Sequence, residues 1–241
     1  MKRLWSHVLF FTALAGSAFG SISFLTSPNA VIDTVNWGNI GADGTLFSDG
    51  QTVTSGLGNV TTIGLGTQPE LGGLTSVVCA AVPVNCSWPE EPSGYNVGDT
   101  LLWLEGLDAN QNPVGTGPLT LSLANAVYGL GAYIQSTSAG AFTATLALYN
   151  GASLLGSHSY SSDVVGDPLF LGAQDTTNEI TKAVFTVTAC GSFACDPNDF
   201  SADTLDIFGS AAVPEPSTFA LSGMLLAVGF AVRNRFKRGN Q

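Results

Sequence analysis

Four cysteines are the residues of this sequence whose chemistry depends most directly on spacing. Cys79 and Cys86 have six residues between them, and Cys190 and Cys195 have four. Four thiols could bind zinc, but the first spacing is wider than that of a usual zinc-ligand pair. In an oxidising compartment we expect two local disulfides, Cys79 with Cys86 and Cys190 with Cys195, each stabilising the fold by roughly 2 kcal/mol. The sequence does not exclude the two crossed pairings.

Side chains suited to catalysis are sparse. His158 is the one histidine after the N-terminal segment, and the sequence contains no Gly-x-Ser-x-Gly nucleophile motif. Glu90 and Glu91 lie between two prolines and most simply form a solvated turn, although two carboxylates are all that a glycosidase needs. The sequence therefore predicts a protein that is not an enzyme, and it offers no catalytic residue.

Oxygen-rich loops make calcium the most credible cofactor, although nothing in the sequence requires one. Asp108–Asn112 alternates oxygen-bearing side chains, but Pro113 stands where an EF-hand needs glycine and Leu119 where it needs glutamate. A hairpin turn is the better interpretation of that segment. Further candidates for calcium binding at loops or strand edges are Asp163, Asp167, Asp175 and Asp203.

Three tryptophans follow the N-terminal segment. Trp88 lies in a proline-rich loop just after Cys86, and we expect it to be exposed. Because exposed aromatic faces commonly bind sugars, Trp88 is the candidate ligand-binding residue. Trp37 and Trp103 lie within apolar alternations and are expected in the core.

The charge distribution excludes several kinds of partner. The chain of 241 residues has 18 Asp and Glu against 7 Lys and Arg, a net charge of -11. Six of the seven cations lie at the two ends, so the body from Ser21 to Val213 has 17 carboxylates and Lys182 alone, about -16. It lacks the clustered cations that bind nucleic acid and the arginines that clamp phosphate.

Two-residue alternation runs through this body, and amphipathic helical periodicity is hard to find. Phe142–Tyr149 is the clearest strand, and Asn150-Gly151 favours a type I′ turn with Ala152–Tyr160 returning antiparallel. In the absence of crossover helices, the pattern predicts an all-β fold, a single antiparallel β-sandwich over residues 21–212. The other expected strands are Ala30–Trp37, Gln51–Thr54, Val60–Leu65, Thr100–Glu105, Leu119–Leu123, Gly129–Gln135, Pro168–Gly172, Ile180–Ala189 and Asp203–Phe208.

The N-terminal segment is typical of a secretory signal peptide. Lys2 and Arg3 precede an apolar run from Leu4 to Ala15, and small residues follow it up to Gly20. This order of charge, apolar run and small residues predicts a signal helix over residues 1–20 and a mature chain that begins near Ser21.

The C-terminal segment, residues 213–241, combines three parts. Pro214, Glu215 and Pro216 precede Thr218–Val232, fifteen residues without a charge. At 1.5 Å per residue, these fifteen span about 22 Å as a helix, which is short for a bilayer core of about 30 Å. The cations expected to flank this transmembrane helix on its cytoplasmic side are Arg233, Arg235, Lys237 and Arg238.

Together, the Pro-Glu-Pro triplet, the apolar helix and the arginine-rich end resemble the bacterial PEP-CTERM sorting signal. The resemblance covers about the last 29 residues and implies an exported protein that an exosortase recognises at the membrane, with delivery to the cell surface or the extracellular space. It also implies a link to exopolysaccharide or biofilm. A tail anchor that is never cut remains the alternative.

The stretch from Gly131 to Gly209 resembles the bodies of other exported PEP-CTERM proteins and the jelly-roll sandwich of galactose-binding-like and carbohydrate-binding modules. Its closing strand would be Phe200–Leu205. The resemblance implies a structural or interaction component of the cell surface or matrix. The alternative is a non-catalytic carbohydrate-binding module, and the partners expected are an exosortase, the membrane and a polysaccharide.

Overall fold

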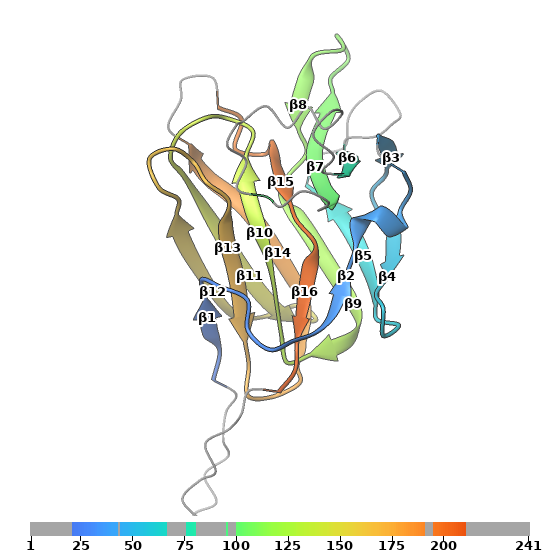
Figure 1. Ribbon diagram of the computed structural model, residues 1–241, viewed down its shortest axis with the longest axis vertical. Coiled ribbons are helices and arrows are strands. Elements are labelled where there is room, and N and C mark those ends of the chain that lie inside the picture. Colours follow the sequence, from blue (N-terminus) through green and yellow to red (C-terminus); the bar gives the residue numbers. More distant parts are fainter. Residues whose placement is uncertain are drawn as a thin grey trace, which may run out of the picture.

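A computed structural model describes residues 21–42, 44–66, 76–80, 95, 100–190 and 195–210 of the chain. Its strands form two antiparallel sheets whose inner faces share one core, an all-β arrangement consistent with the predicted sandwich (Figure 1). The predicted signal helix and C-terminal helix lie outside the described residues.

The larger sheet has ten strands, several of them short. Its central path runs β1-β13-β10-β15-β7-β6-β3. Off this path, β16 pairs with β10, β2 pairs with β16, and β8 pairs with β7. The strands are β1 (Ser23–Leu25), β2 (Val31–Val35), β3 (Thr45–Phe47), β6 (Ser76–Ala80), β7 (Thr100–Leu107), β8 (Pro113–Gly115), β10 (Gly129–Ser136), β13 (Leu169–Gln174), β15 (Phe200–Ala202) and β16 (Leu205–Phe208).

The smaller sheet has six strands in the order β12-β11-β14-β9-β5-β4. They are β4 (Thr52–Thr54), β5 (Val60–Leu65), β9 (Leu119–Val127), β11 (Phe142–Asn150), β12 (Ser153–Ser161) and β14 (Ile180–Cys190). A short 3-10 helix, η1 (Trp37–Asn39), follows β2.

Alternation along the strands decides which side chains enter the core. Leu130 and Ile134 of β10 point inward from the larger sheet, and Leu146 of β11 and Phe185 of β14 meet them from the smaller one. All four side chains are fully buried. In β14, Ala183, Phe185 and Val187 are buried and therefore form its core face.

The hairpin of β11 and β12 has the predicted strands, but its turn differs from the predicted type I′. Asn150 still pairs with Ser153 and belongs to β11. Positive φ occurs at Gly151 alone in this turn, at 57°. A type I′ turn needs positive φ at both central residues, so this turn is of another kind.

The predicted closing strand is interrupted at Asp203 and Thr204, which separate β15 from β16 (Figure 1). Both parts pair with β10, but the register shifts by one residue between Ile134↔Ala202 and Gly131↔Asp206. This is the signature of a β-bulge. The indole Nε1 of Trp37 donates a hydrogen bond to the Asp203 carbonyl at 2.8 Å, so this buried tryptophan fastens the bulge.

The two described ends of the body lie at the same end of the sandwich. Ser23 in β1 pairs with Gln174 at the end of β13, and Gln174 Nε2 donates to the Gly209 carbonyl at 2.7 Å. The hairpin of β7 and β8 projects from the opposite end (Figure 1). A tail that continues from Ser210 therefore leaves the body far from that hairpin.

Candidate functional site

All residues of the predicted sorting signal, 213–241, fall outside the described part of the chain. The predicted signal peptide over residues 1–20 and Trp88, the candidate ligand-binding residue, do so as well. The structure is silent on Pro214, Glu215, Pro216, Arg233, Arg235, Lys237 and Arg238.

One of the two expected disulfides is present. Cys190, at the end of β14, is bonded to Cys195, which leads into β15. The bond therefore ties a strand of the smaller sheet to a strand of the larger one. Cys79 lies in β6 with its backbone opposite Leu101, and its pairing with Cys86 stays a prediction.

An acidic–aromatic patch, formed by Trp103, Glu105 and Asp199, lies on the outer face of the larger sheet. Leu102 and Leu104 of β7 point into the core, so Trp103 and Glu105 point outward. Trp103 was expected in the core but is half-buried here, and its Nε1 donates to Asp199 Oδ1 at 2.8 Å. The apolar run in β7 concealed which of its two faces is buried.

The carboxylates of this patch hold their protons more tightly than usual. Burial, and after it the charge of Asp199, raises the pKa of Glu105 from 4.5 to about 7. Burial raises the pKa of Asp199 to about 6 despite the hydrogen bonds from Trp103 and Thr137. Burial also raises the pKa of Asp206, in β16 of the same sheet, to about 6. This face of the sheet therefore takes up protons under mildly acidic conditions.

Replacing Glu105 by glutamine should flatten the pH dependence of stability. Because the folded state holds this proton more tightly than the unfolded state, the contribution of Glu105 is present below pH 4.5 and is lost as the pH rises to about 7. Glu105 is half-exposed, so we discount the effect for solvent and expect Glu105→Gln to raise Tm by about 2–4 °C at pH 7.5, roughly 1 kcal/mol.

Thermal unfolding at pH 4.5 and pH 7.5 measures this effect. Asp108→Asn is the control, because hydrogen bonds from Asn112 and Asn110 lower the pKa of Asp108, and its loss should reduce stability at pH 7.5. An unchanged Tm of Glu105→Gln at both pH values would refute the expectation.

The candidate calcium ligands do not gather in one place. Asp108 uses both carboxylate oxygens within its own turn, which is the predicted hairpin turn between β7 and β8. Asp163 Oδ1 accepts from the backbone nitrogens of Gly166 and Asp167. Among the described residues, no three acidic, histidine or cysteine side chains converge as a metal site. Asp175 differs from the others because one of its oxygens is buried without a partner.

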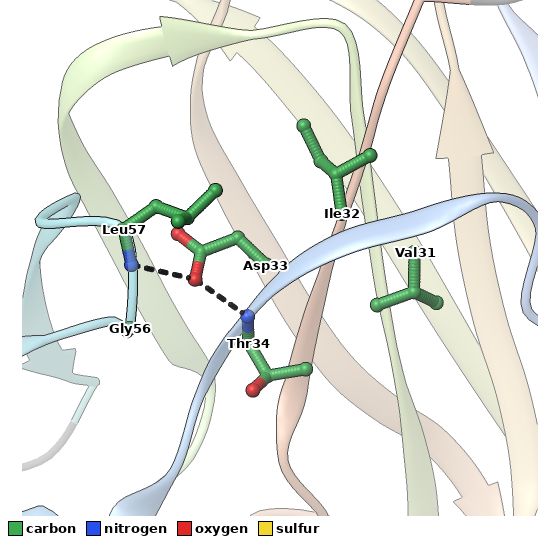
Figure 2. A pocket seen from close by; sticks show the side chains of 6 residues that line it. All are labelled: Val31, Ile32, Asp33, Thr34, Gly56 and Leu57. Carbon is green, nitrogen blue, oxygen red and sulfur yellow. Dashed lines mark hydrogen bonds between the residues drawn. The ribbon is translucent and has the colours of Figure 1, made fainter.

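An open pocket of about 390 Å³ beside β2 is lined in part by the buried residue Asp33 (Figure 2). Asp33 Oδ1 accepts from the backbone nitrogens of Thr34 at 2.9 Å and Leu57 at 3.0 Å. Oδ2 accepts from Asn59 Nδ2 at 3.0 Å and from the Ser55 hydroxyl. Burial alone raises the pKa of Asp33, but these hydrogen bonds together lower it below 3.8. The carboxylate therefore clamps the turn between β4 and β5 to β2, with its oxygens committed to the protein.

The outer face of the smaller sheet, called here the hydroxyl face, is rich in serine and threonine and almost uncharged. Lys182 is the only Asp, Glu, Lys or Arg in its six strands. Cross-strand partners repeat the same chemistry: Thr145 lies between Thr186 and Ser159, and its hydroxyl is 2.6 Å from that of Ser159. The hydroxyl face comprises Thr52, Thr54, Thr62, Thr120, Ser122, Thr143, Thr145, Ser157, Ser159, Ser161 and Thr186.

The sequence pattern indicated part of the hydroxyl face but not the acidic–aromatic patch. Alternation placed Lys182, Val184 and Thr186 together, and extending it across the sheet would have indicated the hydroxyl face. The patch at Glu105 had no such signal, because Trp103 and Asp199 are 96 residues apart.

Comparisons with known proteins identify the C-terminal segment. In the described part of the chain, no helix has the length and apolarity of a membrane span. No curated protein matches the sequence. The family model of the PEP-CTERM protein-sorting motif matches residues 212–235, which contain the Pro-Glu-Pro triplet and the apolar segment. The chain thus has a mainly β body followed by a PEP-CTERM sorting motif, and this motif implies export, recognition by an exosortase and delivery to the cell surface.

Proposed function

We propose that this protein is a non-enzymatic structural or interaction component of the extracellular matrix, associated with exopolysaccharide or biofilm. Residues 21–212 act as one binding domain between a cleaved signal peptide and the sorting segment. The observation that carries the proposal is the hydroxyl face, an almost uncharged surface on a body with a net charge of about -16.

Polysaccharides are polymers of hydroxyl groups, and many extracellular ones are neutral or anionic. A carboxylate-rich surface would repel an anionic polymer, whereas serine and threonine hydroxyls can donate and accept hydrogen bonds without that repulsion. The strands place these hydroxyls at regular spacings of about 4.8 Å across the sheet. An extended polymer could therefore contact several of them at once, which favours many weak contacts over one tight site.

The position of the tail is compatible with this role. Gly209 is held beside Ala30 and Gln174 at one end of the sandwich, and the sorting motif begins at residue 212. While the tail is in the membrane, that end faces the lipid and the hydroxyl face rises from it along the length of the strands. The face is then open to polymer outside the cell.

The test is cosedimentation of the exported protein with purified exopolysaccharide of the producing cell. Ser159→Asp adds a negative charge at an exposed position of the hydroxyl face, in the edge strand β12, and we expect it to weaken binding about tenfold, roughly 1.4 kcal/mol. Ser27→Asp makes the same change at an exposed position between β1 and β2 and should bind like the parent. Equal binding by all three proteins would count against the proposal.

The acidic–aromatic patch supports a second candidate, a carbohydrate-binding module for a specific sugar. Half-buried Trp103 offers an aromatic edge beside two carboxylates, and the Tyr95 hydroxyl lies 2.8 Å from that of Ser201 on the neighbouring strand. Aromatic faces with a few oriented polar groups are typical of sugar sites. In the same assay, binding that is lost in Trp103→Ala and retained in Ser159→Asp would favour this candidate.

A further inference from the structure

The turn after β13 contains a carboxylate oxygen that the described residues leave without a partner. Asp175 is 1% exposed, and its backbone nitrogen donates to the Tyr128 carbonyl at 2.6 Å. Its Oδ1 accepts from the Thr177 nitrogen at 3.1 Å, but its Oδ2 is buried and accepts no hydrogen bond. An ionised oxygen removed from water without compensation is costly, so a partner is expected there.

A second carboxylate closes the same turn. Glu179 Oε1 accepts from the Thr177 hydroxyl at 3.0 Å, so Thr177 contacts both acidic side chains. The Thr177 carbonyl is also in the turn and accepts from the Glu179 nitrogen at 3.1 Å. Carboxylate, hydroxyl and carbonyl oxygens of residues 175, 177 and 179 are therefore linked within one short turn that also contains the buried Oδ2.

Side-chain cations do not neutralise this pair in the described part of the chain. Lys182 is the only lysine or arginine of the body, and its Nζ lies 4.2 Å from the centre of the Tyr149 ring. The imidazole ring of His158 packs against the rings of Phe24 and Tyr160. No ion pair of the described residues involves Asp175 or Glu179, so a bound cation would supply the charge that compensates them.

We propose that a calcium ion binds at this turn, with Asp175 Oδ2 and Glu179 as its anionic ligands and with carbonyl oxygens and water completing the shell. The available donors are all oxygens, which suits a hard cation and disfavours zinc. Calcium accepts irregular coordination, whereas magnesium demands an octahedron. With two carboxylates the affinity should lie at about 10⁻⁴–10⁻³ M, the range of extracellular calcium modules.

This site would stabilise the end of the sandwich from which the tail leaves. The Ser21 nitrogen donates to the Thr176 hydroxyl at 3.2 Å, so the same turn also holds the start of the described chain. The inference is independent of polysaccharide binding, because the turn lies outside the strands that form the hydroxyl face.

The experiment is thermal unfolding of the exported full-length protein, first stripped with a chelator and then titrated with calcium chloride. We expect Tm to rise by about 5 °C at a calcium concentration a hundred times Kd, and chelator to reverse the rise. Asp175→Asn should abolish the calcium-dependent shift, and Glu179→Gln should reduce it. Asp108→Asn, which alters a carboxylate whose oxygens are already hydrogen-bonded, should keep the full shift.

Terbium luminescence on the parent protein provides a measurement that does not depend on the variants folding. Terbium bound at the turn should be displaced by calcium and, at equal concentration, much less by magnesium. The proposal is overturned if calcium leaves the Tm of the parent unchanged, if Asp175→Asn retains the full shift, or if calcium does not displace terbium.

Discussion

A chain that ends at Ala212 should be exported normally but lose its attachment to the cell surface almost completely. The truncation removes the sorting motif together with Thr218–Val232 and the four cations after it. We expect that apolar segment to be the part of the tail that enters the bilayer, with the cations holding its end on the cytoplasmic side. Immunoblots of the surface fraction and the medium measure the result, with the truncated protein expected in the medium.

Comparing the truncation at Ala212 with an alanine variant of the Pro-Glu-Pro triplet separates membrane anchoring from recognition by the exosortase. Alanines at Pro214, Glu215 and Pro216 keep the apolar segment, so we expect full-length protein that stays in the membrane without being processed. Mass spectrometry of the mature protein detects this directly and also distinguishes a processed tail from an anchor that is never cut. If protein ending at Ala212 stays on the surface in parental amounts, the tail is not the means of delivery.

Trp37→Ala should destabilise the body by about 3–5 kcal/mol, the range for removing a large aromatic side chain from a core. Trp37 is completely buried, and its indole nitrogen binds the Asp203 carbonyl at the bulge between β15 and β16. The substitution therefore leaves a cavity. It also removes the hydrogen bond that holds Asp203, the residue between β15, which pairs with β7, and β16, which pairs with β2. Urea denaturation followed by far-UV circular dichroism measures the change in the free energy of unfolding.

Two controls test the cause of this loss. Trp37→Phe keeps most of the packing and removes the hydrogen bond, for which we expect about 1–2 kcal/mol. Trp103→Ala removes the same residue type from a half-buried position on the outer face, and we expect a smaller loss than for Trp37→Ala. Equal losses at the two tryptophans would show that burial at Trp37 does not govern its contribution.

Long strands with clear alternation were predictable from local sequence. The strands Val60–Leu65 and Phe142–Asn150 agree with expectation almost residue for residue, because each has one apolar and one polar face. The short strands β1, β3, β6 and β8 were not predicted. Three to five residues carry too little pattern, and such strands depend on the neighbours with which they pair.

The candidate sites were less predictable than the strands. The Cys190–Cys195 bond is the local pairing that we expected, because only four residues separate the two cysteines. The orientation of Trp103 did not follow from the sequence, because Leu101, Leu102 and Leu104 make β7 apolar on both faces. Asp175 was one of several acidic loop residues, and its burial depends on segments distant in the sequence, including Tyr128.

The destination of this protein was determined by the sequence alone. Export and sorting machinery reads the order of charges and the length of an apolar run in the local sequence. The predicted signal peptide over residues 1–20 and the sorting motif over residues 212–235 are therefore recognisable without a fold. Only the tertiary structure decided which carboxylates are shielded from solvent. Glu105, Asp199 and Asp175 look like any other acidic residues in the chain, and their properties arise because packing brings distant strands together and excludes solvent around them.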